Sequence, residues 1–315
     1  MQNKISIIIP TYNSVSSLKT LLDLLVKKKD IELIVINDGS TDETDELIKE
    51  YNNIKYISYK KNKGIAFARN KGLQKVTSKY FTFIDADDQI DDNMLEILYK
   101  ECEDNNLDLC ICNYNEIINN KSIKSKYRYD NNIYNSKQLL EKTFKDQVST
   151  IVWAKLYKTK VFKEIKFNEN LKINEDYEYV FTCFKKAKKV KLLDQYLYKY
   201  YKNNNSITNN INCIDIKNNN YLVYLKQLKL NKYKNYKYFI NINELRNIHF
   251  YSKCKDKKNR YKYLKKEINK DNLKKLLKEN ISKLNKIEII IYLISIRLYL
   301  LIYPLCIIVR NKIRR

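Results

Sequence analysis

Short apolar runs in the first 120 residues constrain the fold more than any other feature of this sequence. They cover residues 4–10, 31–37, 54–59, 79–84 and 108–112. Apolar runs without polar alternation are typical of parallel strands that are covered by helices on both faces. Helical stretches separate the runs, most clearly at residues 64–76 and 93–104. Strand alternating with helix predicts an α/β fold with a doubly wound, mostly parallel sheet.

The alternation stops after about residue 117. Helices are expected at 136–145 and 175–189, and strands at 151–157 and 191–201, before an Asn-rich loop at 203–220. We therefore expect a main domain over 1–210, with a first half of about 1–117 and a second half of about 118–210. A helical extension rich in Lys, Asn and Tyr follows at 211–285, and a hydrophobic helix with a basic tail occupies 286–315.

The apolar segment 287–309 is long enough to span a bilayer, but two of its residues complicate that interpretation. Arg297 at its centre would cost about 2.5–3.5 kcal/mol on the insertion scale. Pro304 would kink the helix. A buried packing helix, an in-plane interfacial helix and a spanning helix are the alternatives. We favour the interfacial helix, because Arg297 can snorkel and the basic tail would meet anionic lipid at the cytoplasmic face.

The net charge of +25 raises the question of nucleic-acid binding. Most of the cations are Lys, whereas specific phosphate and base recognition favours Arg, and no RNA-binding motif is present. We therefore expect no nucleic-acid partner. The seven cysteines are an odd number, and no signal peptide precedes them, which predicts a cytoplasmic protein with reduced thiols. His249 is the single histidine, so a histidine-based mechanism is not expected.

Three polar motifs each follow one of the predicted parallel strands. They are Thr11-Tyr12-Asn13, Asp38-Gly39-Ser40 and Asp85-Ala86-Asp87. In open α/β sheets the ligand crevice lies outside the carboxyl ends of the strands. The three motifs are therefore expected to converge on one site.

Asp85 and Asp87 form a D-x-D pair directly after a buried strand. Two carboxylates separated by a small residue can reach one hard cation, and Mg²⁺ or Mn²⁺ takes oxygen ligands. D-x-D pairs are also common at surfaces and helix caps. Burial after an apolar strand favours the metal, because buried carboxylates without a cation are costly. Asp91 and Asp92 are better explained as helix N-terminal residues.

Four motifs together resemble the family 2 glycosyltransferases, which have the GT-A fold. They are P-T-Y-N at 10–13, N-D-G-S-T-D at 37–42, N-x-G-x-x-x-A-R-N-x-G at 62–72 and D-A-D-D at 85–88. The resemblance covers roughly the first 120 residues. It implies a donor-binding set of Pro10, Thr11, Tyr12, Asn13, Asp38, Asn62, Gly64, Ala68, Arg69, Asp85, Ala86 and Asp87.

Individual roles follow from the same resemblance. Asp38 would accept a hydrogen bond from the base, typically uracil N3–H, although a turn role before Gly39 is the alternative. Arg69 would supply positive charge to the donor site, or else bridge its helix to an acidic loop. Asp85 would touch the ribose or sugar, and Asp87 would bind the metal. Gly64, like Gly72, would permit close backbone approach.

The acceptor half carries weaker signals. Asp176 in "NEDYEYVF" resembles the catalytic base of the family, with Glu175 in reserve, and two acids favouring a helix N-terminus are the alternative. Trp153 is a candidate for stacking on an acceptor sugar, or else a core residue. Lys202 stands where a Tyr-rich stretch of the family often carries Arg, and many relatives have Asn in place of Ala154.

These expectations define a leading hypothesis. It is an inverting, metal-dependent transferase that moves a sugar from a nucleotide-diphosphate donor, most simply a UDP-sugar, to a glycan or lipid-linked acceptor in cell-surface polysaccharide synthesis. Q-x-x-R-W is absent, so a processive polymerase is not indicated. A nucleotidyltransferase would need a Gly- and Arg-rich phosphate loop, which residues 10–20 lack. A basic, non-enzymatic nucleotide- or membrane-binding protein is the remaining alternative.

Overall fold

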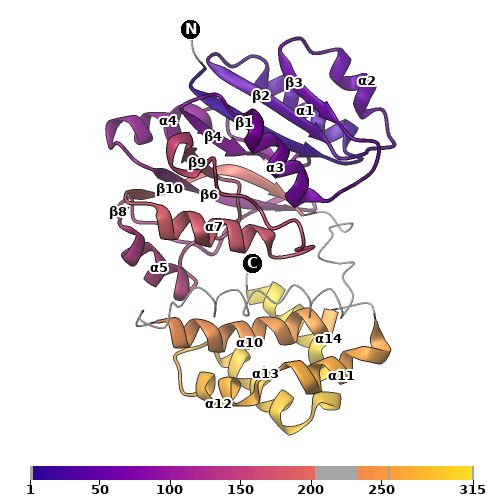
Figure 1. Cartoon of the computed structure of the whole chain (residues 1–315). Coiled ribbons are helices and arrows are strands. Elements are labelled where there is room, and N and C mark those ends of the chain that lie inside the picture. The colour runs from indigo at the N-terminus through magenta and orange to yellow at the C-terminus, as the bar shows by residue number, and fades with distance from the viewer. Residues whose placement is uncertain (1–2, 203–232, 234, 254–255, 314–315) are drawn as a thin grey trace. The chain divides into compact units, whose positions relative to one another are not determined.

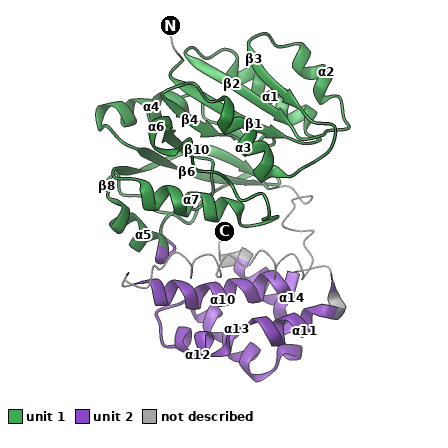
Figure 2. Cartoon of the chain, in the orientation of Figure 1, with its two compact units in different colours: residues 1–143, 147–202 green, residues 144–146, 203–315 purple. Residues whose placement is uncertain are grey.

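The computed structural model describes residues 3–202, 233, 235–253 and 256–313, and it divides them into two compact units (Figure 1, Figure 2). Unit 1 comprises residues 1–143 and 147–202, and unit 2 comprises residues 144–146 and 203–315. The domain boundary expected at residue 210 and the loop expected at 203–220 lie outside the described residues. Each unit is described separately below.

Unit 1 is built on one mixed sheet whose long pairings are parallel. Its strands are β1 (Ile5–Thr11), β2 (Ile31–Asn37), β3 (Ile54–Ser58), β4 (Tyr80–Phe83), β5 (Gln89–Ile90), β6 (Leu109–Ile118), β7 (Lys121–Lys124), β8 (Ile133–Tyr134), β9 (Lys155–Lys158) and β10 (Val190–Tyr201). The order is β3-β2-β1-β4-β9-β6-β10-β5, with β7 beside β6 and β8 beside β10. The antiparallel pairings, such as β4 with β9, span only two to four residues. The predicted α/β fold with a mostly parallel sheet is confirmed.

The apolar runs form the buried centre of this sheet. Every residue of β1 and β4 is buried, because helices cover these strands. The helices of the first 202 residues are α1 (Val15–Leu25), α2 (Thr44–Lys49), α3 (Ile65–Lys75), α4 (Met94–Asp104), α5 (Ser136–Phe144), α6 (Thr159–Phe162) and α7 (Glu175–Lys186). A Cβ at Gly72 of α3 would lie 2.3 Å from Cγ2 of Ile8, so a glycine lets α3 approach β1 closely.

The strand expected at 151–157 is shorter and later than the sequence pattern indicates. β9 begins only at Lys155, and Ala154 before it has φ +56°. This left-handed conformation interrupts an extended strand and is one that Asn adopts more readily than Ala. It gives a physical reason for the Asn that the family resemblance implies at this position.

Unit 2 is helical in its described part, as the sequence predicts for the C-terminal extension. It contains α10 (Tyr236–Lys253), α11 (Lys257–Glu267), α12 (Lys270–Leu277), α13 (Lys283–Ile294) and α14 (Ile296–Ile313). A buried polar network joins three of these helices: His249 Nε2 lies 2.7 Å from Glu288 Oε2, and Arg310 Nη2 donates to both Glu288 oxygens. His249 is therefore structural.

The expectation of one continuous helix over 287–309 is wrong. Ser295, with φ −153° and ψ 115°, separates α13 from α14, and Pro304 lies inside α14. Extended backbone at Ser295 breaks the helical hydrogen bonding and redirects the chain. Among the described residues, no helix combines the length and apolarity needed to cross a bilayer. Beyond Arg310, the side chains of the basic tail lie outside the described residues.

Candidate active site

The loops after β1 and β2 lie side by side at the carboxyl edge of the sheet. Thr11 pairs with Asn37 in the last register position of the two strands. Asn13 N donates to Ser40 Oγ at 2.9 Å, and Asn13 Oδ1 accepts from Thr41 N at 2.7 Å. Ser40 thus holds the preceding loop and does not cap α2, which begins only at Thr44.

Asp38 joins this edge to the start of α3. Its Oδ1 accepts from Lys63 N at 2.9 Å, and its Oδ2 accepts from Gly64 N at 2.7 Å. Burial raises the pKa of Asp38, while these two N–H groups oppose the shift. The carboxylate therefore orders the 62–64 loop, and each oxygen keeps a second lone pair for another donor.

Glycine is favoured at position 64 for a different reason from the one expected. It is the N-cap residue of α3 and has φ +99°, while a Cβ at this position would meet nothing within 4 Å. Conformation and not crowding selects glycine here, because residues with side chains rarely adopt this φ. Gly39 is the crowded position of this edge: its Cβ would lie 2.6 Å from Asn62 N.

Arg69 of α3 brings three distant carboxylates together. Its Nη2 lies 3.0 Å from Asp85 Oδ1, and its Nη1 lies 3.2 Å from Glu175 Oε1 and 2.5 Å from Asp176 Oδ1. The Arg69 side chain is only 4% exposed, so these ion pairs are shielded from solvent. The structure therefore places the D-x-D loop and the first turn of α7 at one guanidinium.

The site holds more carboxyl groups than basic side chains. Burial raises the pKa of Asp85, and the nearby Asp176 and Asp87 add to this shift. Burial and Asp176 raise the pKa of Glu175 to about 8. Burial and the charges of Asp85 and Asp87 raise the pKa of Asp88 to about 9. A bound cation would relieve this repulsion and favour the ionised carboxylates.

The residues present suit Mg²⁺ or Mn²⁺ in one particular way. Asp87 is exposed at the end of the loop, and Asp85 is partly buried behind it. In the described part of the chain, no three His, Cys, Asp or Glu side chains are arranged to hold a metal ion. Mg²⁺ is commonly bound by one or two carboxylates together with substrate phosphates, so the D-x-D pair alone fits it.

Asp88 and Tyr198 position the D-x-D loop, a role that the sequence analysis missed. Tyr198 Oη donates to Asp88 Oδ2 at 2.8 Å and accepts from Asp85 N at 3.2 Å. Tyr201 N donates to Asp88 Oδ1 at 2.8 Å. Asp88 is 1% exposed, so it fixes the loop to β10 from within. The fourth letter of D-A-D-D was the available signal.

The remaining donor candidates differ in exposure. Tyr12, Asn13 and Asn62 are exposed, and Tyr12 is 49% exposed, which is unusual for so large a ring. Pro10, Thr11 and Ala86 are buried in or beside the strand ends. Ala68, also in the predicted donor-binding set, has a fully buried side chain inside α3.

The two acceptor candidates have different surroundings. Trp153 is 5% exposed and stacks on Tyr198 and Tyr200, with ring centroids 4.4 and 5.3 Å away. This packing supports the core alternative for Trp153 over stacking on an acceptor sugar. Lys202 follows β10, and its side chain is 52% exposed and 3.9 Å from Glu116.

Lys155 is a buried cation that the sequence analysis did not single out. It is 0% exposed, and its Nζ lies 3.4 Å from the Trp153 carbonyl oxygen. Burial lowers the pKa of Lys155 to about 7, against the opposing influence of Cys112, Asp176 and Cys183. Nothing in the local sequence indicates that a lysine inside a short strand is buried.

Comparison with known proteins gives the family of this chain. The model of the family "Glycosyl transferase family 2" matches residues 6–166. The chain therefore belongs to the family 2 glycosyltransferases. Streptococcus pneumoniae glycosyltransferase GlyA is 32% identical over 64% of this chain and 31% of its own length. Bacillus subtilis glycosyltransferase EpsJ is 30% identical over 65% of this chain and 62% of its own length.

Solved structures support the fold. S. aureus TarS 1–349 in complex with UDP-GlcNAc superposes with a TM-score of 0.59 at 18% identity, covering 94% of this chain and 82% of that chain. The chain spans less than two thirds of the length of GlyA and EpsJ. Family membership and the GT-A fold are thus shown.

Proposed function

We propose that this protein transfers a sugar, with inversion, from a nucleotide-diphosphate donor to a glycan or lipid-linked acceptor in cell-surface polysaccharide synthesis. The observation that carries the proposal is the meeting of Asp85 and Asp176 at Arg69. A donor-side carboxylate and a candidate base from separate parts of the chain share one guanidinium. A UDP-sugar is the proposed donor, in keeping with the UDP-GlcNAc complex of TarS.

Each group has a definite part in this reaction. Asp176 would accept the proton of the acceptor hydroxyl as that oxygen bonds to the anomeric carbon from the face opposite the diphosphate. The bond between the anomeric carbon and the diphosphate oxygen breaks, and the nucleoside diphosphate leaves. Mg²⁺ or Mn²⁺ at Asp87 and Asp85 would offset the charge of the leaving group. Glu175 is the reserve base.

The donor-site residues would divide recognition between base and phosphates. Tyr12 offers an exposed ring beside the strand edge where Asp38 lies. Asp38 would use its remaining lone pairs for uracil N3–H, while Asn13 and Asn62 border the same loops. Lys202, exposed at the end of β10, would approach the acceptor or a phosphate as a point charge.

A donor screen tests the proposal. The full chain is incubated with a panel of nucleotide sugars and Mn²⁺ or Mg²⁺, and the released nucleotide is identified. We expect release of a nucleoside diphosphate from one or a few donors. Release of pyrophosphate would instead identify a nucleotidyltransferase. Steeply salt-dependent binding without affinity for any nucleotide sugar would identify a non-enzymatic binding protein.

The C-terminal segments belong to a separate part of the proposal. We propose that residues 211–285 form the helical extension of the 1–210 catalytic domain, and that residues 286–315 associate peripherally with the inner face of the cell membrane. Exposed Ile and Leu side chains on α13 and α14 support this role. Deletion of 287–315 is expected to reduce membrane association in cell fractionation.

A further inference from the structure

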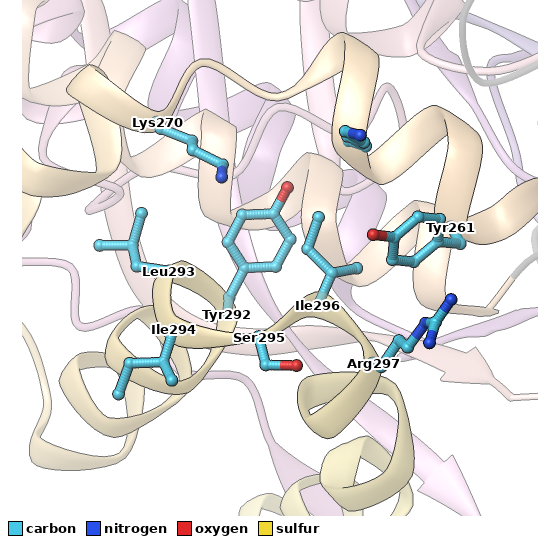
Figure 3. A pocket seen from close by; sticks show the side chains of 9 residues that line it. Tyr261, Lys270, Tyr292, Leu293, Ile294, Ser295, Ile296 and Arg297 are labelled. Atoms are coloured by element: carbon cyan, nitrogen blue, oxygen red, sulfur yellow. The ribbon is translucent and has the colours of Figure 1, made fainter.

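A pocket lies at the break between α13 and α14 in unit 2. Its volume is about 330 Å³, and it is lined by Tyr261, Lys265, Lys270, Tyr292, Ser295 and Arg297 among others. Figure 3 shows Lys270, Tyr292 and Arg297 around this pocket. Ser295, whose backbone is extended, lies in this lining between the end of α13 and the start of α14.

Half of the polar side chains that line this pocket are cationic, and none is acidic. Lys265, Lys270 and Arg297 form no ion pair with a carboxylate in the part of the chain that the structure describes. Arg297 lies over the ring of Tyr261 at 5.6 Å. Tyr292 Oη is already committed, since it donates to the Leu264 carbonyl oxygen at 2.6 Å. Three cations without an acidic partner suit a phosphate-sized anion.

An apolar stripe runs along both helices. Its members are Ile287, Ile290, Ile294, Leu298, Leu301, Leu305, Ile308 and Val309, and each is 43–76% exposed. Their spacing of three or four residues places them on one face of each helix. Ile294 belongs to both the stripe and the pocket. Apolar surface and phosphate-binding charge are therefore adjacent.

The two helices are apolar on the outside and carry tyrosine on the inside. Tyr292, Tyr299 and Tyr303 are at most 4% exposed, whereas Ile294 and Leu301 are 74% and 76% exposed. An ordinary surface helix of a water-soluble domain has the opposite arrangement. Contiguous exposed apolar surface of this kind marks a partner or membrane surface.

We propose that the α13–α14 break is a binding site for the phosphate of an anionic phospholipid, with the apolar stripe inserted among the acyl chains of the same membrane leaflet. This inference deepens the peripheral membrane association proposed above and rests on it. Lys265, Lys270 and Arg297 bind the phosphate, while Ile294, Leu298 and Leu301 contact hydrocarbon. The combination favours a bilayer over a soluble anion, because a soluble anion has no use for the stripe.

Vesicle co-sedimentation of the full chain tests the site. The chain is expected to bind vesicles of phosphatidylcholine with phosphatidylglycerol far more tightly than vesicles of phosphatidylcholine alone. Combined Lys265→Ala, Lys270→Ala and Arg297→Ala should weaken the first interaction about 100-fold, since each basic residue near an anionic surface contributes about fivefold. Leu301→Glu should weaken binding to both kinds of vesicle.

A matched triple variant supplies the control. Lys262, Lys266 and Lys275 are exposed lysines of α11 and α12, the helices that carry Lys265 and Lys270, and they lie outside the pocket lining. Their replacement by Ala removes equal charge and should cost less than about tenfold. Equal losses in the two triple variants would overturn the phosphate site in favour of diffuse attraction. Asp176→Asn should bind vesicles normally, which separates this test from the catalytic proposal.

Two further measurements address other occupants of the surface. Inorganic phosphate is titrated into the chain without vesicles, and light scattering reports the oligomeric state. Tight phosphate binding with Leu301→Glu vesicle affinity unchanged would overturn the lipid in favour of a soluble anion. A dimer that Leu301→Glu dissociates, again without any change in vesicle binding, would assign the stripe to a second copy of the chain.

Discussion

Arg69 Nη1 donates to Asp176 Oδ1 at 2.5 Å while Nη2 of the same guanidinium donates to Asp85 at 3.0 Å. These two carboxylates are separated by about 90 residues of chain, and they meet because α3 and α7 both approach the end of β4. Arg69 opposes the rise that burial causes in the pKa of Asp85, and the same guanidinium fixes the position of Asp176. A bound donor would then interact with the same guanidinium.

Asp176→Asn is expected to reduce glycosyl transfer by roughly 10²- to 10⁴-fold, because the amide cannot take the acceptor proton. Affinity for the nucleoside diphosphate should stay near that of the unmodified chain, since Asn preserves shape. Single-turnover product formation and calorimetric titration measure the two quantities. Glu175→Gln is the matched control and should retain activity within about tenfold. Unchanged turnover in Asp176→Asn would transfer the role to another residue.

Asp87→Ala is expected to lower activity about 100-fold and to raise the Mn²⁺ concentration needed for half-maximal rate. Removal of metal with a chelator should abolish nucleotide release, and added Mn²⁺ should restore it. Asp92→Ala is the control, because this acid lies in the same stretch but is exposed near Lys28. Activity of Asp87→Ala at the original metal concentration would rule out the metal role.

Tyr198→Phe removes the hydroxyl that joins Asp88 to the backbone of Asp85. Loss of these hydrogen bonds should lower the free energy of unfolding by about 1–2 kcal/mol and kcat/KM by about tenfold. Denaturant titration and steady-state kinetics across Mn²⁺ concentrations measure both. Tyr201→Phe removes only a hydroxyl that contacts Gln89, so its catalytic effect should be negligible. Identical kinetics in the two variants would contradict a positioning role.

Lys155→Met is expected to change how stability depends on pH. Burial lowers the pKa of Lys155 to about 7 in the folded chain, whereas an unfolded lysine titrates near 10.5. The folded state therefore binds fewer protons between these values, and its stability rises with pH across this interval. Below about pH 7 the full cost of the buried charge is present.

The variant should therefore be more stable than the unmodified chain at pH 6, by on the order of 3 kcal/mol, and the difference should shrink towards pH 10. Thermal unfolding across this range measures it. Lys158→Met, on the same strand but paired with Asn106, should show no such trend. Parallel stability curves for Lys155→Met and the unmodified chain would contradict the lowered pKa.

Gly72→Ala should destabilise unit 1 by about 1–3 kcal/mol, because its methyl would lie 2.3 Å from Ile8 Cγ2. The double variant with Ile8→Ala is expected to lose less than the sum of the two single losses, since the shorter side chain makes room. Denaturant unfolding of the four proteins gives the coupling energy. Strict additivity would show that α3 and β1 adjust independently.

Local sequence predicted some structural elements of this protein and missed others. The runs at 4–10 and 31–37 predicted β1 and β2 closely, because continuous apolarity over such lengths has few other solutions. The convergence of the polar motifs followed from the direction of parallel strands. Ala154 and Ser295 escaped prediction, because their backbone conformations depend on neighbouring elements and not on their own propensities.

The environments of Trp153 and Asp88 could not be predicted from the sequence. A single Trp can stack on a sugar or on tyrosines, and only its neighbours Tyr198 and Tyr200 distinguish these alternatives. Asp88 has the same side chain as Asp87 one residue earlier, yet Asp88 is buried and Asp87 is exposed. Alternation along the chain gives each a different environment, and contacts with β10 decide which is which.

The sequence by itself determined the alternating α/β order, the family and the set of acidic motifs, because these depend on local periodicity and short spacings. Only the tertiary structure decided which carboxylates share Arg69, which aromatic rings are buried and where the C-terminal helix breaks. Those outcomes depend on contacts between residues that lie far apart in the chain, and such contacts leave no periodic signal in the sequence.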